Sequence, residues 1–599
     1  PIKHSNPIMH NNPIKNNNPM KNNNPMKSNN PIKNNSISSN LNKNNMNNEL
    51  FDFPFYKWEK ELADKPFLKQ PFGNLWETYT WNEVGLMARK LSNGLKSLGL
   101  EKDSHIGLVS KNCREWVIAD LAISMAGYIS VPFFPTLNSK EIKNLLTFGD
   151  VKALFVGKLE NWEEMKKGVD LEMPIIAFPQ YKDHSKVEVG HQWHEFINKF
   201  DAQTEDFRPN LKDIWTVIFT SGTTGDPKGV VLTYETLFNT KRITEDGNPL
   251  KVDLSGKNRF ISYMPLNHIF ERVVIEHVAF RYGGTISFVE SLETFAQNLN
   301  DTQPTAFQGV PRIYMKFQEK ILMKMPQAKL DKLLKIPIIS WLIKRKLKGA
   351  LGMSKAKALV TGAAAMPLEL LDWYRSLGIF ITNGYGMTEN CATCTNLDPY
   401  QPLGRGSVGR PTPGVDLKIS DQGEILMKGP FILSCYYKNE EVTNETLKDG
   451  WLHTGDKGHI DDDGFLFITG RIKDMFKTSK GKYIEPGVLE AYFGNVSEFS
   501  QVCVVGLNCD QPLLLAVPTE IAKNNKEVTN SKISKILEKV NSNLDNYKKM
   551  SKIIFVQEDW LPENGMTTPT LKIKRSKIDE KFSSQYLNWL KSEDDVIWE

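Results

Sequence analysis

The sequence predicts an α/β protein with a large N-terminal domain and a small α+β C-terminal domain. Its 599 residues exceed one ordinary domain, and a composition of 40% hydrophobic and 24% charged residues is typical of globular proteins. From Tyr79 onward, segments with helical spacing of apolar residues alternate with short apolar runs, as in α/β domains. A compact pattern of strands and helices then runs from Val488 to the end.

The first predicted elements lie between residues 81 and 134. Residues 81–98 carry apolar side chains at helical spacing and predict a helix, and residues 106–109 are a short apolar run that predicts a strand. A second helix is predicted over 116–126, and a second strand over 129–134, which ends near Pro135. These are successive βα units.

The boundary between the two domains is expected at the segment GRIKD, residues 470–474. Residues 461–464 predict a turn before it, and charge and glycine increase through FKTSKGKYIEP after it. We therefore expect domains at 49–472 and 473–599. The local sequence is equally consistent with an ordinary charged linker at this point.

The first 36 residues are a hexad repeat, beginning PIKHSN, PIMHNN, PIKNNN. A proline opens each hexad, and one or two apolar residues per repeat cannot form a core. Asn-rich sequence continues to Asn48. Residues 1–48 are therefore expected to be disordered rather than to form a solenoid.

Met46 stands directly before the first globular-looking sequence. We hypothesise that translation starts at Met46 and that the repeat is dispensable, because the repeat has no apolar pattern that could pack on a domain. A truncated protein beginning at Met46 should keep its thermal unfolding temperature and its activity. Loss of either would refute the hypothesis.

Composition disfavours several classes of function. The net charge of +5 is small for this length, and there is no basic stripe with interleaved aromatic residues, so nucleic acid is not an expected partner. Six scattered cysteines do not form a disulfide framework and indicate a reducing compartment, with the cytoplasm as the default. Cys391 and Cys394 form a C-x-x-C pair, but no second pair or nearby histidine completes a zinc site. No apolar run reaches the ~20 residues needed to cross a bilayer, and no signal-peptide pattern is present.

Residues 218–229, IFTSGTTGDPKG, predict a loop that binds a polyphosphate. Its glycines allow close approach of the main chain to phosphate oxygens, its Ser and Thr residues offer short donors, and Lys228 adds a positive charge. The spacing does not match the usual phosphate loop G-x-x-x-x-G-K-[ST], which disfavours an ordinary P-loop NTPase. The alternative is a flexible surface turn between two strands.

Four further segments follow in order: YGMTE (385–389), WLHTGD (451–456), GRIKD (470–474) and TPTLKIKR (568–575). Together with the loop, they resemble the motifs of the adenylate-forming superfamily, which includes acyl-CoA synthetases, luciferases and the adenylation domains of peptide synthetases. The likeness extends over roughly residues 55–599. It implies a large N-terminal domain of several subdomains that forms the adenylate, and a small mobile C-terminal domain.

The resemblance implies that ATP and a carboxylate react to give an acyl-adenylate and pyrophosphate. Both reactants are anions, so the site must gather positive charge. By family match, Lys572 would contact the carboxylate and the bridging oxygen, and a flexible ammonium suits a group that moves with the small domain. The alternative is that Lys572, Lys574 and Arg575 form a solvated basic cluster.

The resemblance also implies the remaining parts of the ATP site. Glu389 is expected to bind Mg²⁺ together with Thr220, because hard oxygen ligands suit this ion. Thr388 would donate to the α-phosphate, so that the implied catalytic residues are Lys572, Thr388 and Glu389. Tyr385 is expected to stack on adenine, with small residues forming a flat wall on the other side of the ring. The alternative is that these small residues only form a tight turn. The full set implied to contact ATP or AMP is Thr220, Ser221, Gly222, Thr223, Thr224, Gly225, Lys228, Gly362, Ala363, Ala364, Asn383, Gly384, Tyr385, Gly386, Thr388, Asp456, Arg471 and Lys572.

Within this set, Asp456 matches a residue that binds both ribose hydroxyls, and Arg471 matches a second ribose or phosphate contact. For the second half-reaction, Lys473 matches the family's hinge, and Lys480, Gly481 and Lys482 match the loop that shapes the coenzyme A tunnel. The sequence departs from many relatives here, because they have Gly-Gly at Lys480-Gly481. Cys435 also replaces a frequent glycine. Details of the tunnel are therefore left open, including whether Lys480 pairs with a phosphate of CoA or faces water.

Residues 262–273, SYMPLNHIFERV, and 309–316, GVPRIYMK, resemble the long-chain branch of the acyl-CoA synthetases. The resemblance implies a long-chain fatty acid:CoA ligase (AMP-forming), with long-chain fatty acid, ATP, Mg²⁺ and CoA as its substrates and cofactors. An apolar tunnel for the acyl chain should accompany it. Two alternatives remain: an enzyme that transfers the acyl group to a carrier protein, or a scaffold that binds adenylate without catalysis.

Residues 330–347 combine Leu, Ile and Trp with many lysines, and Pro337 is expected to bend the segment. Such a basic amphipathic surface could lie on the inner face of an anionic membrane, giving a peripheral contact. A helical insertion packed on the main domain, with a solvated basic face, is the alternative. A homodimer is also left open by the sequence.

Overall fold

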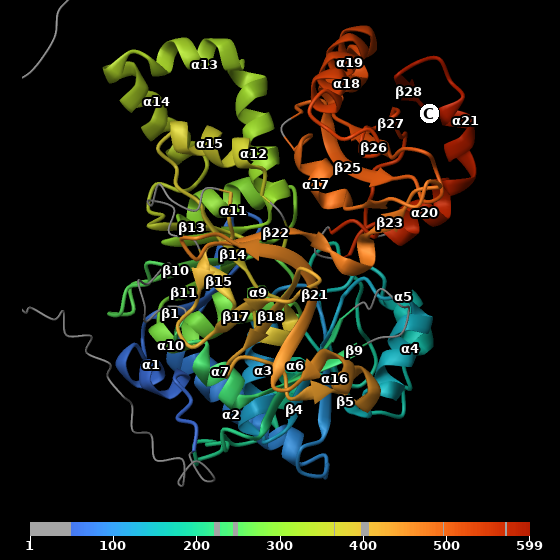
Figure 1. Ribbon diagram of the computed structural model, residues 1–599. Coiled ribbons are helices and arrows are strands. Elements are labelled where there is room, and N and C mark those ends of the chain that lie inside the picture. The colour runs from blue at the N-terminus through green and yellow to red at the C-terminus, as the bar shows by residue number, and fades with distance from the viewer. Residues whose placement is uncertain are drawn as a thin grey trace, which may run out of the picture. The chain divides into compact units, whose positions relative to one another are not determined.

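The structure is a computed structural model that describes residues 50–220, 228–242, 250–364, 366–396, 406–494, 496–562, 564–568 and 572–599. The chain divides into two units at Asn47, and every described residue belongs to the second unit. The hexad repeat of residues 1–48 lies outside the described residues. The mixed α/β fold that the sequence predicts is confirmed in the part that the structure describes (Figure 1).

The largest sheet has the strand order β19-β9-β8-β4-β3-β5-β6-β7 (Figure 1). Its strands from β8 to β7 are parallel, whereas β8–β9 and β9–β19 are antiparallel pairs. In that order the strands span Cys435–Tyr436, Lys228–Thr233, Ile214–Thr220, Ile129–Phe133, His105–Val109, Val151–Val156, Ile175–Ala177 and His191–Gln192. Strands β3 and β4 are buried along their whole length, because helices cover both faces of such a sheet.

The predicted βα units are confirmed. The structure has α2 at Trp81–Lys96, β3 at His105–Val109, α3 at Arg114–Met125 and β4 at Ile129–Phe133. Helix α2 begins with a capping box, in which the side chain of Thr80 accepts from the Glu83 backbone and that of Glu83 accepts from the Thr80 backbone. Every residue of α3 is buried, so this helix lies inside the domain rather than on its surface.

Three smaller sheets complete the larger part of the chain. Their strand orders are β10-β11-β1-β2, β12-β13-β14-β15-β16 and β17-β18-β21-β20, with β22 paired to β21. The strands, by number, are β1 Pro66–Phe72, β2 Leu75–Thr80, β10 Arg259–Ser262, β11 Thr285–Phe288, β12 Ala306–Gly309, β13 Ala358–Thr361, β14 Thr382–Tyr385, β15 Thr395–Asn396, β16 Arg410–Pro411, β17 Asp416–Ile419, β18 Glu424–Lys428, β20 Leu447–Lys448, β21 Trp451–Ile460 and β22 Leu466–Arg471. The accompanying helices are α1 Phe55–Glu61, α4 Ser139–Phe148, α5 Trp162–Met165, α6 Trp193–Asn198, α7 Tyr234–Asn239, α9 Ile269–Glu271, α10 Val278–Tyr282, α11 Phe295–Thr302, α12 Pro311–Lys324, α15 Leu368–Ser376 and α16 Glu440–Thr446.

The C-terminal residues form the predicted α+β pattern. A sheet of order β25-β26-β27-β28 has an antiparallel first pair and parallel later pairs. Alternate residues of β26 enter two different hydrophobic clusters, so both faces of this sheet are covered. The elements are β23 Phe476–Lys477, β24 Tyr483–Ile484, α17 Pro486–Ala491, β25 Phe499–Val505, β26 Leu513–Pro518, α18 Glu520–Asn524, α19 Lys526–Asn541, β27 Ile553–Phe555, α20 Arg575–Phe582, α21 Tyr586–Leu590 and β28 Val596–Trp598.

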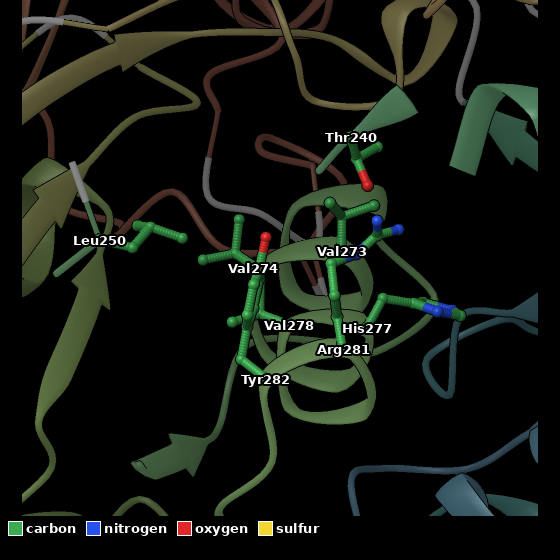
Figure 2. A pocket seen from close by; sticks show the side chains of 8 residues that line it. All are labelled: Thr240, Leu250, Val273, Val274, His277, Val278, Arg281 and Tyr282. Atoms are coloured by element: carbon green, nitrogen blue, oxygen red, sulfur yellow. The ribbon is translucent and has the colours of Figure 1, made fainter. Parts of the chain in front are cut away.

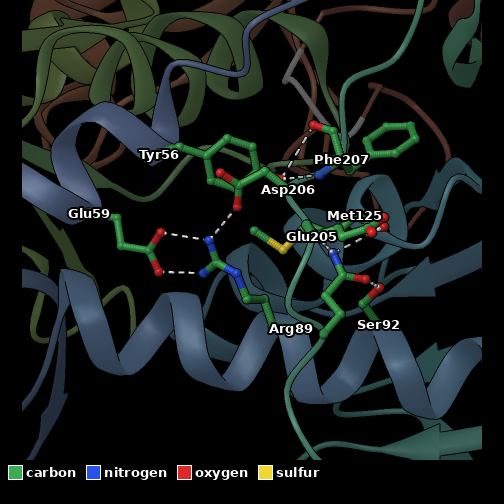
Figure 3. Close-up of polar contacts among 9 residues, drawn as sticks. Tyr56, Glu59, Arg89, Ser92, Met125, Glu205, Asp206 and Phe207 are labelled. Carbon is green, nitrogen blue, oxygen red and sulfur yellow. Dashed lines mark hydrogen bonds and ion pairs between the residues drawn. The ribbon is translucent and has the colours of Figure 1, made fainter.

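Arg89 of α2 connects the start of the described chain to the segment before β8 (Figure 3). Its guanidinium donates to Glu59 Oε2 at 2.9 Å and to Asp206 Oδ1 at 2.8 Å. The Phe207 amide donates to the Tyr56 hydroxyl at 3.0 Å beside this ion pair. The half-buried arginine thus joins α2 both to α1, through Glu59, and to the segment before β8, through Asp206, more firmly than a single exposed pair would.

Residues 330–347 form two helices rather than one bent helix. Helix α13 spans Gln327–Leu334, and α14 begins at Pro337 and ends at Ala350 (Figure 1). Proline has no N–H and is tolerated at the first helical position, where that donor would have no partner within the helix. The expected bend is therefore a break followed by a new helix. No helix within the described ranges is both long and apolar enough to cross a bilayer.

A buried arginine joins three elements of the core. Arg272 begins a π-helical turn, Arg272–His277, that connects α9 to α10. Its guanidinium donates to Asp120 Oδ1 of α3 at 2.5 Å and to Thr216 Oγ1 of β8 at 2.7 Å. The Ser130 hydroxyl of β4 donates to the same Asp120 oxygen. The interaction therefore ties the helix to the strand that leads to the predicted phosphate loop.

Glu276 lies one helical turn beyond Arg272, with 3.7 Å between the Arg272 Nε and Glu276 Oε2 atoms. Burial raises the pKa of Glu276 well above its ordinary value, which favours the neutral carboxyl. Burial also lowers the pKa of the neighbouring His277. Asp120, Glu276 and His277 are close enough to hold a metal ion, but Arg272 already supplies the positive charge that Asp120 requires. We therefore regard this cluster as structural.

Candidate active site

Strands β8 and β9 present the two ends of the predicted phosphate loop. They are antiparallel, with Thr220 opposite Lys228, and the Thr220 hydroxyl donates to the Lys228 carbonyl at 3.4 Å. Both strands are buried through their apolar middle residues, and Thr220 and Lys228 at their loop ends are half-buried. The loop residues Ser221, Gly222, Thr223, Thr224 and Gly225 lie outside the described residues.

Tyr436 links Lys228 to Glu389, the predicted magnesium ligand. The Lys228 ammonium lies 5.5 Å from the centre of the Tyr436 ring, and the Tyr436 hydroxyl donates to Glu389 Oε1 at 2.8 Å. Tyr436 is in β19, opposite Val230 of β9. Burial and the Glu389 charge raise the pKa of Tyr436, so this hydroxyl remains a donor. Sequence reasoning missed Tyr436, because its pairing joins segments about two hundred residues apart.

Tyr385, Asp456 and Arg471 are in direct contact. The Tyr385 hydroxyl donates to Asp456 Oδ2 at 2.6 Å, and Arg471 Nε lies 2.9 Å from Asp456 Oδ1. Asp456 of β21 is opposite Arg471 of β22 in the strand register, which explains their proximity. The Asp456 side chain is 7% exposed and that of Arg471 is 45% exposed, so the arginine is the solvent-exposed partner of the pair. Burial and Asp456 raise the pKa of Tyr385 well above its ordinary value.

Lys572 lies in the electrostatic field of these groups. Its pKa is lowered by burial and by Arg471, whereas Asp456 and Glu389 oppose the shift. Lys572 also helps burial to lower the pKa of His268 to about 3, so that histidine is neutral. The backbone around Lys572 is held by a bond from the Thr568 amide to the Lys572 carbonyl, at 2.7 Å. A lysine near the end of the chain thus interacts electrostatically with residues of β21, β22 and the YGMTE motif.

Arg575, the last residue of TPTLKIKR, is not part of a solvated basic cluster. The Arg575 guanidinium lies 2.8 Å from Glu490 and donates to the Val504 carbonyl, and only 13% of its side chain is exposed. Arg575 therefore stabilises the C-terminal sheet. Lys572, in contrast, interacts electrostatically with Asp456 and Glu389.

The predicted small residues follow two neighbouring parallel strands. Gly362, Ala363 and Ala364 follow β13, and Asn383 and Gly384 are in β14, with Thr361 opposite Asn383. A Cβ atom at Gly362 would lie 3.2 Å from the Gly384 carbonyl oxygen, and Ala363 has a positive φ of 66°. The carboxyl ends of parallel strands commonly form ligand crevices, which is consistent with the expected adenine wall.

Two residues of the YGMTE motif are held by the local backbone. A Cβ atom at Gly386 would lie 2.5 Å from the Ala392 carbonyl carbon, so only glycine fits there without a shift of the main chain. Thr388 is buried at the start of a 3₁₀ turn, Thr388–Asn390, which also carries Glu389. The Asn383 side chain donates to the Ser407 carbonyl at 3.0 Å and helps to fix β14. The structure therefore positions the motif, and the roles of its side chains toward ATP stay predictions.

The expected hinge and coenzyme A loop lie at the surface. Lys473 is exposed in a short turn, Ile472–Asp474. Lys480 lies 3.2 Å from Asp510, with both side chains more than 60% exposed, so it pairs with a carboxylate in this structure. Gly481 has a positive φ of 75°, and its amide donates to the Thr478 carbonyl. The Lys482 amide donates to the Thr478 hydroxyl at 3.2 Å, which completes the turn.

A small cavity adjoins the π-helical turn, lined by residues that include Val273, Val274 and Val278 (Figure 2). Its volume of about 10 Å³ is room for roughly one water molecule, which is far too small for a fatty acyl chain. The expected acyl tunnel is therefore not located by this cavity.

Comparisons with known proteins agree with this geometry. The family model "AMP-binding enzyme" matches residues 55–437, and "AMP-binding enzyme C-terminal domain" matches residues 473–588. The chain is 30% identical to long chain acyl-CoA synthetase 4 of Arabidopsis thaliana over 501 residues, which cover 75% of this chain and 74% of the relative.

Two solved structures have a similar fold. The anthranilate CoA ligase AuaEII, in complex with anthranoyl-AMP, has a TM-score of 0.73 and 22% identity, over 90% of this chain and 99% of that chain. The o-succinylbenzoate coenzyme A synthetase of Bacillus subtilis, in complex with ATP and magnesium ion, has a TM-score of 0.66 and 21% identity, over 89% of this chain and 100% of that chain.

Proposed function

Because this chain belongs to the AMP-binding enzyme family, we propose that it converts long-chain fatty acids to acyl-CoA through an acyl-adenylate, releasing AMP and pyrophosphate. The family membership makes it an adenylate-forming enzyme. One observation supports the proposal at the level of single residues. Lys572, from the C-terminal part of the chain, interacts electrostatically with Arg471, Asp456 and Glu389. Such a site provides cations, which a reaction between two anions requires, and carboxylates, which can bind a metal ion.

The residues of the site fit ATP and Mg²⁺. When bound, ATP would supply the adenylyl group and Mg²⁺ would neutralise phosphate charge. Glu389 would hold the ion with Thr220, since the Tyr436 hydroxyl bonds only one Glu389 oxygen and orients the carboxylate. A synthetase of similar fold is known in complex with ATP and magnesium ion, which supports these two ligands for the proposed site.

Each charged side chain then has a separate task. Lys572 and Arg471 would hold the fatty carboxylate and the phosphate oxygens close together by offsetting their repulsion. Each Asp456 oxygen accepts one bond now and has a second lone pair with which to accept from a ribose hydroxyl. The Tyr385 hydroxyl bonds one Asp456 oxygen and Arg471 contacts the other, so that both hold the carboxylate in place.

The acyl group is proposed from similarity. The relative from Arabidopsis thaliana is a long chain acyl-CoA synthetase, and residues 262–273 and 309–316 resemble that branch. A thiol of CoA is the corresponding acceptor. The small domain would bring Lys480, Gly481 and Lys482 to the acceptor in the second half-reaction, with Lys473 as the hinge.

We expect the purified protein to release AMP only when ATP, Mg²⁺, a fatty acid and CoA are all present. Each added methylene contributes about 0.8 kcal/mol, so kcat/KM should rise about fourfold per carbon up to a plateau between about twelve and eighteen carbons. The measurement is AMP release with CoA, with acyl carrier protein and with neither acceptor.

Isotope exchange between labelled pyrophosphate and ATP is the matched control, because it reports adenylate formation without any acceptor. If pyrophosphate exchange occurs but AMP is released only when acyl carrier protein is added, the result would favour an enzyme that depends on a carrier protein. Absence of exchange with every acid would indicate a scaffold and would contradict the proposal.

A further inference from the structure

Helix α14 and the residues before it expose large apolar side chains. The side chains of Ile336, Ile338, Trp341 and Leu342, which we call the α14 surface, are 47%, 76%, 57% and 52% exposed. Among the tryptophans that the structure describes, Trp341 is the most exposed. Isolated exposed apolar residues are common, but four within seven consecutive positions form a patch that requires an explanation.

The opposite face of α14 packs against the protein core. Ile343 and Leu347 pack against the core cluster of the neighbouring helices, together with Leu334 of α13. Ile338, Trp341 and Leu342 follow one another at i, i+3 and i+4, so they occupy one face that points away from this core. Figure 1 shows α13 and α14 as neighbouring helices in yellow-green. Packing within the described chain therefore fixes α14 and leaves its outer apolar turn uncovered.

Positive charge surrounds the α14 surface. Between residues 326 and 350 the sequence has seven basic residues and a single acidic one, Asp331. Lys335 precedes the patch and is exposed, and the exposed Arg345 and Lys346 follow it on the same helical face. The Arg345 guanidinium lies 5.4 Å from the centre of the Trp341 ring. The whole chain has a net charge of only +5, so this segment concentrates basic residues locally.

We propose that the α14 surface docks on an anionic lipid bilayer, with Ile338, Trp341 and Leu342 in the headgroup region and the basic residues on the phosphates. Tryptophan favours the boundary between headgroups and acyl chains, and basic residues beside an inserted apolar turn add electrostatic attraction to anionic lipids. The helix has 14 residues, so it lies on the surface and does not span the bilayer. A surface for an acidic protein partner would show the same charge but would not need three large apolar residues in one outer turn.

The test uses the full chain and vesicles, without ATP or fatty acid, so its outcome is independent of the proposed enzymatic function. The protein is floated with phosphatidylcholine vesicles, either pure or containing about 30% phosphatidylglycerol. We expect the partition coefficient to be about tenfold higher for the anionic vesicles and to fall as salt is raised. Equal recovery with both vesicle types, or no binding to either, would overturn the proposal.

Two variants separate the apolar and basic contributions. Ile338→Ser/Trp341→Ser and Lys335→Glu/Arg345→Glu/Lys346→Glu should each lower the partition coefficient about tenfold. The matched control is Val528→Ser/Leu587→Ser on α19 and α21, where the side chains are 69% and 64% exposed, and it should bind as the wild type does. All substituted residues are exposed, and unchanged circular dichroism checks that each variant is folded.

Light scattering in the absence of lipid distinguishes a protein interface. If Ile338→Ser/Trp341→Ser dissociates a dimer and leaves vesicle binding unchanged, the α14 surface joins copies of this chain and the proposal is wrong. If the variant stays in the wild-type oligomeric state and loses vesicle binding, the proposal holds.

Discussion

Lys572→Ala is expected to lower the rate of acyl-adenylate formation by about a hundredfold to a thousandfold, which is the cost of removing one preorganised charge at a reacting centre. Transfer to CoA from supplied acyl-adenylate should change far less, because the two anions have already been joined in that reaction. The measurement is exchange of labelled pyrophosphate into ATP for the first half-reaction and release of AMP from supplied acyl-adenylate for the second.

Lys574→Ala is the matched control. Lys574 is two residues away and half-buried, but no contact joins it to Asp456 or Glu389 among the described interactions. Its loss should leave pyrophosphate exchange within about twofold of the wild type, as for most surface substitutions. An equal loss of both half-reactions in Lys572→Ala would remove the role that we assign to this lysine.

The lowered pKa of Lys572 gives this role a pH signature. The ammonium is charged below its lowered pKa and loses its proton as the pH rises through that value. Bound phosphates would favour the charged form and raise the pKa again. The alkaline limb of kcat/KM, which reports the free enzyme, should therefore lie at lower pH than the alkaline limb of kcat.

The local spacing of apolar residues was sufficient to predict the helices and strands of the first βα units. Helix α2 and strand β4 lie within two residues of their predicted ends, because burial on one face or on both produces a regular apolar pattern. The break at Pro337 was predicted only as a bend, since proline is compatible both with a kink and with the first turn of a new helix.

Contacts between distant segments could not be read from these patterns. Tyr436 lies between Lys228 and Glu389 through the pairing of β19 with β9, and nothing local in the sequence specifies that pairing. The motifs placed Asp456 and Arg471 in one site by resemblance, and the antiparallel register of β21 and β22 supplies the physical reason for their contact. Strand register depends on both partners, so a single segment does not reveal it.

The buried Arg272 cluster was likewise missed, and it carries the largest expected effect on stability. Arg272→Met should lower the free energy of unfolding by about 3–5 kcal/mol, because it leaves the Asp120 carboxylate buried without its cation. Methionine retains much of the side-chain volume, so loss of packing is limited. The guanidinium also lies 4.4 Å from the centre of the Trp215 ring, and tryptophan fluorescence during urea unfolding can follow the change.

Glu276→Gln is the matched control in the same cluster, and it should change the stability by less than about 1 kcal/mol at a pH below the unfolded pKa of Glu276, where the carboxyl is protonated in both the folded and the unfolded chain and the replacement is isosteric. Burial raises the pKa of the Glu276 carboxyl well above its ordinary value in the folded protein, which favours its neutral form. A raised folded pKa contributes stability that is complete below the unfolded pKa and is lost as the pH rises toward the folded value. The wild type should therefore lose stability relative to Glu276→Gln as the pH rises above the unfolded pKa of 4.5 toward the raised folded value. A large loss in Glu276→Gln at pH 7 would mean that Glu276 is ionised and shares Arg272 with Asp120, so that the cluster holds two negative charges on one cation.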